Sequence, residues 1–456
     1  MKRFLLILAL LLTPSAAWAQ CNGVFPALSA CGNPTGSAAI PTIMPLSSIT
    51  AAAGTNGQVQ YNNSGVLGGY TSVQLGAVVP GIGGTTDASL PPYNADPTGV
   101  SSSTTAINSA IAAACPSANG TVYLPPGTYL INGGLNMTNI TGGHISGGCR
   151  LRGAGNTATV LKTTTSTNAA IDLTGSSSII IEDLWIQTAA TTTFGILLSA
   201  SNTLPCNVIR MMNVTIAGLF NTAGVYINNC SDGLFDHGAV ASNLGSVATA
   251  DIAITATNPL GAVSSYTTIS AVSPAQSGDW SFLDFQIHDL AKAAGTSSVI
   301  PLYIQGSFSP VKWFGGIIAG SVQAGGGTVT FDGTGPQLFS AIGTQFYGDN
   351  GTQSVAALYC RTSCAGITIH NSSVLYSATF LGITNGQTVS RLSISGNTFS
   401  GGTFIAANSG NVTVTGGFVD AASLALNLGA GGTLSHIVVS NPGTITAGTQ
   451  TAVGSF

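Results

Sequence analysis

The chain has 456 residues, of which only 5% are charged and 44% are hydrophobic. This combination favours a large folded body with small polar surface residues and argues against a disordered chain. The formal net charge of −4 argues against nucleic acid and anionic membrane as partners, because both are bound by clusters of Lys and Arg.

The first 19 residues have the order of an export signal. Lys2 and Arg3 precede an apolar run from Phe4 to Leu12, and Ala17-Trp18-Ala19 forms a cleavage site. The run is too short to span a bilayer. We therefore expect a secreted or extracellular protein with no membrane association after cleavage. The mature chain keeps eight basic residues against 14 acidic ones, a net charge of −6.

Residues 20–92 are rich in Gly, Pro and Ser and show no sustained hydrophobic period. Within them, the stretch from Gly54 to Gly69, with Gly-Gln-Val-Gln-Tyr-Asn-Asn near its middle, resembles a segment of phage tail-fibre and tailspike proteins. The resemblance implies an attachment region and a virion-associated protein. A low-complexity linker is the alternative interpretation.

The stretch from Asn94 to Ile131 predicts the start of the main domain. Ile107, Ala110, Ile111 and Ala114 recur at the spacing of a short amphipathic helix, and Ser103 or Thr104 can cap its first turn. A strand at 121–124 and a turn at Pro125-Pro126-Gly127 follow.

A weak repeat of alternating apolar residues, each interrupted by Asn, Asp or Gly, runs from about residue 140 to 440. Its interruptions at Asp183 and Asn213 are 30 residues apart, and those at Asn371 and Gly396 are 25 apart. Spacings of this size are typical of a solenoid, in which the apolar residues point inward and the interruption turns a corner. Asp284 is expected at a corner as well.

The order of helix and then Gly-Thr-Val-Tyr-Leu-Pro-Pro-Gly-Thr-Tyr (120–129) resembles the opening of the pectate-lyase-like superfamily, which includes many phage tailspikes. The resemblance implies an all-β fold: a right-handed, single-stranded parallel β-helix with a short N-terminal capping α-helix. We assign residues 93–445 to it and 446–456 to a C-terminal tail. A homotrimer, as in tailspikes, would cover the exposed edge of the last coil.

Eight cysteines in an exported chain suggest disulfides, and their order favours local pairs. Free buried thiols are the alternative. The predicted pairs are Cys21–Cys31, Cys115–Cys149, Cys206–Cys230 and Cys360–Cys364.

The densest polar cluster lies between Cys230 and Gly238. Asp232, Asp236 and His237 provide groups for general acid–base cleavage of a glycosidic bond. The run loosely resembles polygalacturonase motifs, although Phe235-Asp236 stands where those motifs have paired Asp. A coil whose turn uses Asp and Gly is the alternative.

Glu182, the only Glu in the chain, is a candidate partner for Asp236 across the coil of Asn213. Carboxylates two coils apart approach the separation of inverting glycosidases. Arg210, one coil from Glu182, is a candidate base for eliminating a uronide. Only such a lyase would imply Ca²⁺, and no Asp cluster with Ca²⁺-ligand spacing is present. No other metal or cofactor is expected.

Trp280, Trp313 and Tyr226 are candidates for stacking on sugar rings, with core packing as the alternative. The leading hypothesis is a tailspike-like protein that binds a polysaccharide, such as capsule, lipopolysaccharide or a pectin-like polymer. Depolymerase activity is an open question, and hydrolysis is favoured over elimination. The rival is a secreted bacterial protein of the same fold, either a pectinase-like enzyme or a non-catalytic surface adhesin.

Overall fold

The computed structural model divides the chain into two units, Met1–Gly83 and Gly84–Phe456. In the second unit it describes residues 85–400 with gaps at 116–119, 142–147, 202–203, 244–247, 256–277, 289–298, 306–307, 321–326, 333–336, 349–355, 376, 378, 385–386 and 388. Beyond these, only strands are described, at 29–32, 42–45, 59–63, 66–70, 403–407, 412–419, 426–427 and 433–439. The predicted signal at 1–19 and the tail at 446–456 lie outside the described residues.

The first unit contains two antiparallel strand pairs. β1 (Ser29–Gly32) pairs with β2 (Thr42–Pro45), and β3 (Val59–Asn63) pairs with β4 (Val66–Tyr70). The second strand pair overlaps the tail-fibre-like segment.

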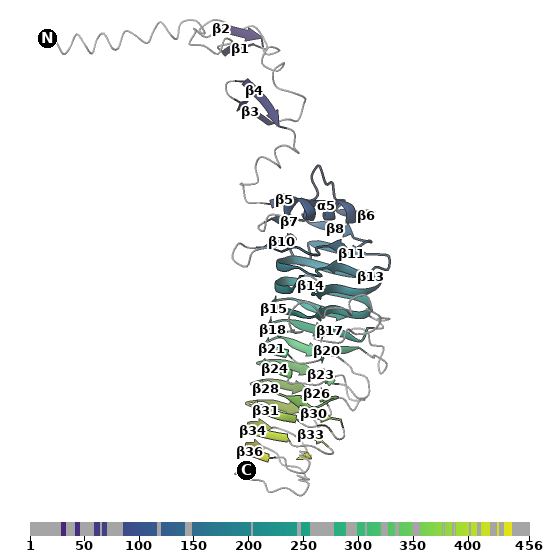
Figure 1. The fold of residues 1–456 in the computed structure, drawn as a ribbon, viewed down its shortest axis with the longest axis vertical. Helices are drawn as coiled ribbons and strands as arrows, with labels where there is room; N and C mark the ends of the chain where they lie inside the picture. The colour runs from purple at the N-terminus through teal and green to yellow at the C-terminus, as the bar shows by residue number, and fades with distance from the viewer. Residues whose placement is uncertain are drawn as a thin grey trace, which may run out of the picture. The chain divides into compact units, whose positions relative to one another are not determined.

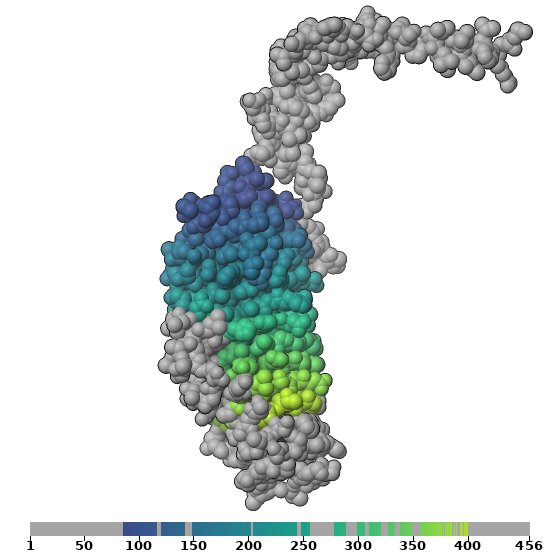
Figure 2. Space-filling model, turned by 180° about the vertical axis from the view of Figure 1, so that it is seen from behind, coloured from purple at the N-terminus to yellow at the C-terminus, as the bar shows by residue number. Residues whose placement is uncertain are grey.

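The second unit is a parallel β-solenoid (Figure 1). Its strands fall into three columns, which we call faces A, B and C. Two long strands, β13 (Ser177–Ser199) and β14 (Cys206–Asn228), contribute to all three faces. Successive rungs advance along the solenoid as bands of colour in Figure 2. The predicted parallel β-helix is confirmed.

Face A also contains β5 (Thr85–Asp87), β7 (Thr121–Tyr123), β10 (Cys149–Arg152), β15 (Cys230–Asp236), β18 (Gly278–Leu283), β21 (Phe308–Phe314), β24 (Gln337–Ile342), β28 (Ile367–His370), β31 (Val389–Ser395), β34 (Val412–Val419) and β36 (Thr433–Val439). Face B contains β6 (Thr98–Ser102), β8 (Gly127–Leu130), β11 (Thr159–Thr163), β16 (Ala239–Ser242), β19 (Gln286–His288), β22 (Ile317–Ala319), β25 (Gln345–Tyr347), β29 (Ser373–Leu375) and β32 (Thr398–Ser400). Face C contains β9 (Leu135–Asn136), β12 (Ala169–Asp172), β17 (Ala250–Thr255), β20 (Ile300–Gln305), β23 (Gly327–Asp332), β26 (Ala356–Cys360), β30 (Thr379–Ile383), β33 (Thr403–Ala407) and β35 (Leu426–Asn427), and the short β27 (Cys364–Ala365) precedes β28.

The solenoid begins with β5, which pairs with β7 and so places the first strand eight residues before the predicted start at 93. The predicted capping helix is α5 (Thr104–Ala114), which buries Ile107, Ala110 and Ile111. It packs against β5, β7 and β9 at the N-terminal end of the solenoid.

The predicted side-chain cap of this helix is wrong. The hydroxyl of Ser103 makes no capping bond. It donates to the backbone carbonyl of Asp96 at 3.1 Å and accepts from the backbone N–H of Asp96 at 2.9 Å. The backbone of Asp96 thus takes the place of a helix N–H as the partner of this hydroxyl, and it fixes the start of the helix to the preceding segment.

The corner between faces A and B is a column of residues in the left-handed region. At each of them the chain bends from face A to face B. The column consists of Asp183, Asn213, His237, Asp284, Gly315, Gly343, Asn371 and Gly396, with φ between 46° and 66°. The corners predicted at Asp183, Asn213, Asp284, Asn371 and Gly396 are confirmed. Asn, Asp and Gly tolerate this conformation better than other residues, which explains the interruptions in the repeat.

Three of the four predicted disulfides are present. They join Cys115 to Cys149, Cys206 to Cys230 and Cys360 to Cys364. The first links α5 to β10, and the second links neighbouring rungs on face A. The side chains of Cys21 and Cys31 lie outside the described residues. No helix in the described part of the chain is long and apolar enough to cross a membrane.

Candidate functional site

The charged residues predicted for catalysis gather on the outer side of face A, over the rungs of β10, β13, β14 and β15. The strand registers place Arg152, Glu182, Met212 and Asp236 in one outward column. Glu182 and Asp236 are thus two rungs apart, as predicted. Since rungs rise about 4.8 Å each, their backbones are separated by about 9–10 Å.

Glu182 is held between two guanidinium groups. Its Oε1 lies 3.3 Å from Nη1 of Arg150 and 3.5 Å from Nε of Arg152. Arg152 also lies 3.8 Å from Oδ2 of Asp183 at the corner. Glu182 is only 7% exposed, whereas both arginines reach solvent. The two cations therefore offset the burial of this carboxylate and fix its position.

Arg210 lies on the rung between Glu182 and Asp236, in the neighbouring outward column. It is two residues from Met212, or about 7 Å along the strand. Its side chain is exposed. Among the described residues no carboxylate lies within ion-pair distance of it. Its guanidinium is available to an anionic ligand.

Asp236 belongs to a short chain of acid and base groups. Its Oδ1 contacts Nδ1 of His237, and Nε2 of His237 lies 3.7 Å from Oδ2 of Asp284 one rung below. The Asp236 side chain is 29% exposed and that of His237 is 69% exposed. A proton can therefore pass between the Asp236 carboxylate and solvent through the imidazole.

Asp232 is not part of this chain. It lies at the opposite end of β15, four residues from Asp236, which corresponds to about 13 Å along the strand. It has a φ of 56° and accepts a hydrogen bond from the Ser231 hydroxyl at 3.2 Å. Asp232 is therefore a turn residue, which was the alternative to a catalytic role for this cluster.

The three aromatic residues predicted to stack on sugars do not lie on the surface. Trp280, Trp313 and Tyr226 are each 0% exposed. Trp313 stacks on Phe282 at 4.4 Å inside the solenoid, and Trp280 donates its indole N–H to the Cys230 carbonyl at 2.9 Å. The substrate-binding prediction must be corrected, because these rings have no face that a glycan can reach.

Tyr226 points outward on face C but is also covered. Its ring stacks on Phe194 with centroids 5.0 Å apart, and its hydroxyl accepts a hydrogen bond from Thr255 at 3.2 Å. Its environment is a second apolar cluster with Leu197, Ala253 and Tyr303.

Sequence analysis missed the second role of two corner residues. Asp284, predicted only as a corner, faces His237, and Asn213 donates to Oδ1 of Asp183 at 2.8 Å. Both contacts follow from the corner column, because side chains at one corner stack on successive rungs. His288 lies on face B, where its Nε2 contacts Oε1 of Gln286 at 2.8 Å. Burial lowers the pKa of His288.

No group of three or more His, Cys, Asp and Glu side chains that could hold a metal ion occurs within the described residues. The pectate-lyase-like resemblance implies Ca²⁺ only for an elimination reaction. The described residues do not supply its usual cluster of oxygen ligands, and we derive no step that involves a metal.

These features define a parallel β-helix whose outer face A carries paired acid and base groups. Residues 90–258 match the family described as rhamnogalacturonase A/epimerase, pectate lyase-like. The chain therefore has the pectate-lyase-like β-helix fold, a fold of carbohydrate-active proteins, and the predicted resemblance is confirmed. No curated protein matches the chain.

Solved structures include similar folds from phage and bacteria. The Dettilon tailspike protein matches 83% of this chain and 70% of its own length, with 13% identity and a TM-score of 0.51. ORF18 of Geobacillus virus E2 matches 87% of this chain at 15% identity and a TM-score of 0.45, and this chain covers 66% of it. The A-module of mannuronan C-5 epimerase AlgE4 from Azotobacter vinelandii matches 81% of this chain and 99% of its own length, with 12% identity and a TM-score of 0.47. At these identities the similarity shows the fold alone.

Proposed function

We propose that this chain is an exported or virion-associated, tailspike-like protein that binds a polysaccharide on face A and hydrolyses it there. One observation carries the proposal. Glu182 and Asp236 share an outward column two rungs apart, with Arg210 on the rung between them. A backbone separation of about 9–10 Å is close to the 6.5–9.5 Å between carboxyl groups in inverting glycosidases, which leaves room for a water molecule.

The two carboxylates have different surroundings and therefore different roles. Glu182 is held between Arg150 and Arg152, which suits a base that takes a proton from the attacking water. Asp236 is more exposed and contacts His237, which suits an acid that protonates the leaving oxygen. The water oxygen bonds to the anomeric carbon as the glycosidic bond breaks. His237 then passes a proton from solvent to Asp236, and Glu182 releases to solvent the proton that it took from water, which restores both carboxyl groups.

Arg210 supports an acidic polysaccharide as the substrate. An exposed guanidinium without a carboxylate partner in the described structure can pair with a uronate or another sugar acid. Capsule, lipopolysaccharide and pectin-like polymers all carry such groups, and they are the substrates we propose. Arg210 also favours a second candidate, β-elimination of a uronide, in which it would act as the base.

The burial of Glu182 favours a further candidate. At 7% exposure this carboxylate has little access to a substrate, which suits a secreted adhesin that binds glycan without cutting it. A pectinase-like bacterial enzyme would use the same face A residues as the phage protein. We include a homotrimer in the proposal, because among the described residues no element follows β36, and the strands of a second and third chain could cover its edge.

A depolymerisation assay separates these candidates. The purified full chain is incubated with host capsule, host lipopolysaccharide and polygalacturonate, and new reducing ends are measured together with absorbance in the unsaturated-uronide band. Hydrolysis gives reducing ends without that absorbance, elimination gives both, and an adhesin gives neither.

Asp236→Asn should lower the rate at least about 100-fold, the scale of a general acid. Asp279→Asn is the control, because Asp279 is an aspartate of face A that lies at the far corner from Asp236 and is more exposed than Asp236. It should retain the wild-type rate. An unchanged rate for Asp236→Asn would remove that residue from the mechanism.

A further inference from the structure

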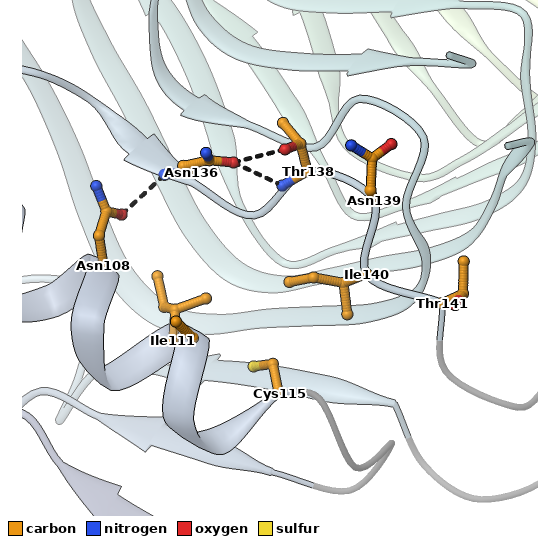
Figure 3. Close-up of a pocket in the computed structure, with 9 residues that line it drawn as sticks. Asn108, Ile111, Cys115, Asn136, Thr138, Asn139, Ile140 and Thr141 are labelled. Atoms are coloured by element: carbon orange, nitrogen blue, oxygen red, sulfur yellow. Dashed lines mark hydrogen bonds between the residues drawn. The ribbon is translucent and has the colours of Figure 1, made fainter. Parts of the chain in front are cut away.

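A pocket of about 450 Å³ lies at the N-terminal end of the solenoid, and none of the charged residues of face A lines it. Figure 3 shows it between the second half of α5 and the segment that follows β9. Asn108, Ile111, Ala112 and Cys115 contribute from the helix, and residues 136 and 138–141 line the other side. Its size lies within the range of small-molecule sites.

The pocket has an apolar floor. Ile111 and Cys115 are 2% and 4% exposed and belong to the solenoid core. Ile140 is partly buried against the same core, and its side chain points towards the helix in Figure 3. The disulfide from Cys115 to Cys149 fixes this end of α5 against the first rungs. A ligand with one apolar side can therefore rest on a rigid surface.

The polar wall of the pocket is held in place before any ligand arrives. Oδ1 of Asn108 accepts from the backbone N–H of Asn136 at 2.8 Å, and its amide group donates to the Gly134 carbonyl at 3.3 Å. Oδ1 of Asn136 accepts from the N–H and the hydroxyl of Thr138, at 3.0 and 2.7 Å. Preorganised groups of this kind lose little entropy when they bind.

Other polar groups of the pocket remain unused. Within the described residues, the amide N–H₂ of Asn136, the side-chain amide of Asn139 and the hydroxyl of Thr141 have no hydrogen-bond partner, and all three residues are exposed. None of the nine lining residues is charged. The available chemistry is therefore amide and hydroxyl groups around an apolar floor, which discriminates against a charged ligand.

We propose that this pocket binds a neutral pyranose, with N-acetylhexosamine as the best fit because its acetamido methyl can contact Ile111 and Ile140. It is a second glycan site, separate from the acid and base groups of face A, and it does not depend on catalysis there. A chain with both sites would hold a polymer at this N-terminal pocket while face A acts on another part of the same polymer.

Calorimetric titration of the full chain with N-acetylglucosamine, glucose, galacturonate and glucosamine tests the proposal. We expect saturable binding of N-acetylglucosamine with a Kd on the order of 1 mM, the range expected for a ligand of this size. The charged sugars should bind this pocket at least tenfold more weakly. Because Arg210 on face A is proposed to pair with uronates, galacturonate is titrated into the Arg210→Ala variant. Equal binding of galacturonate and N-acetylglucosamine by that variant, or no saturable binding of the neutral sugars, would overturn the proposal.

Two tryptophan substitutions on α5 provide a matched pair. Ala112 and Ala113 are both exposed, but only Ala112 lines the pocket. Ala112→Trp should fill the pocket and weaken binding of N-acetylglucosamine at least tenfold, and Ala113→Trp should leave it within twofold. Thermal melts verify that both variants fold. Equal weakening by the two variants would contradict the site.

The Asp236→Asn variant separates this proposal from hydrolysis on face A. It should bind N-acetylglucosamine like the wild type even where depolymerisation is lost. Loss of this binding in Asp236→Asn would show that the sugar binds at face A, and it would contradict the proposal that the sugar binds in the N-terminal pocket.

Discussion

The upper and lower rungs of face A have the same backbone arrangement but different outward side chains. The upper rungs, from β10 to β15, present Arg150, Glu182, Arg210 and Asp236. From β18 to β24 the column of Glu182 and Asp236 continues with Leu283, Phe314 and Ile342. The column of Arg150 and Arg210 continues with Ser281, Lys312 and Ser340, so neither continuation contains a carboxylate. The candidate chemistry is therefore a property of the outward residues of a few rungs.

The inward side chains change at the same place. On face A the inward residues above β15 are aliphatic or Cys, such as Ile181 and Met211, and aromatic rings enter the core from β15 to β24 at Phe235, Trp280, Phe282, Trp313 and Phe339. Phe235 stacks on Phe282 at 4.8 Å, and Phe282 stacks on Trp313 at 4.4 Å. Because inward and outward residues alternate along each strand, the inward residues of face A can be altered without changing the outward side chains of the candidate site.

The largest effect should come from the start of the aromatic core. Trp280 fits in its rung because Gly233 directly above it has no side chain, and a Cβ there would lie 1.8 Å from a ring carbon of Trp280. We expect Gly233→Ala to reduce the free energy of unfolding by about 3 kcal/mol, as overpacking does. Denaturant unfolding measures it.

Trp280→Leu in the Gly233→Ala background is the control. The smaller side chain removes the clash, so the double variant should be more stable than the sum of the two single effects by at least about 1 kcal/mol. Additive effects would show that the two residues do not determine each other's packing.

The next largest effect concerns the buried carboxylate of the upper rungs. Glu182→Gln leaves Arg150 and Arg152 without their shared anion. We expect a loss of about 1–2 kcal/mol in the free energy of unfolding, reduced from the value for a fully buried pair because both arginines are solvent-exposed. Asp284→Asn, which changes an exposed carboxylate one rung below β15, should change stability by less than about 0.5 kcal/mol. Equal losses would contradict the difference between the two regions.

A smaller gain is expected at the other corner of face A. Val208 has a φ of 54°, which is unfavourable for a β-branched residue. Val208→Asn should raise the free energy of unfolding by about 1 kcal/mol, because Asn tolerates the left-handed region. Val208→Thr keeps the branch and should show no gain. A stabilised Thr variant would mean that the effect is not conformational.

The smallest effect is a pH dependence on face B. Burial lowers the pKa of His288 below its usual value of 6.5. Above 6.5 the residue is neutral in both states and has no effect. As the pH falls below 6.5, the unfolded chain binds the proton first, and stability decreases until the lowered pKa is passed. His288→Gln should flatten the stability curve between pH 7 and 5, and an unchanged slope would exclude this residue as its source.

Much of the fold could be predicted because its signals are local. The Asp183 and Asn213 interruptions mark corners for a stereochemical reason, and the Ile107–Ile111 stripe marks the buried side of a helix. The Glu182–Asp236 column followed from the repeat spacing.

The other contacts of the candidate site could not be predicted, because they depend on the register between the strands of neighbouring rungs. Which arginine meets Glu182 depends on how β10 aligns with β13, and the sequence does not show this alignment because β11, β12 and their turns lie between the two strands. The inward position of Trp280 was visible, because Trp280 and Phe282 alternate in the repeat like Ile179 and Ile181. The sugar-stacking hypothesis gave too little weight to that alternation.

The anomeric configuration of the first product tests the central claim most directly. Proton NMR during digestion of the polysaccharide that the chain depolymerises records it before the sugar equilibrates. Two carboxylates on one outward column, two rungs apart and too far from each other for a covalent glycosyl-enzyme mechanism, predict inversion at the anomeric carbon. Retention would require carboxylates about 5 Å apart and would contradict the assignment of Glu182 and Asp236, as would the absence of any released sugar from every polymer tested.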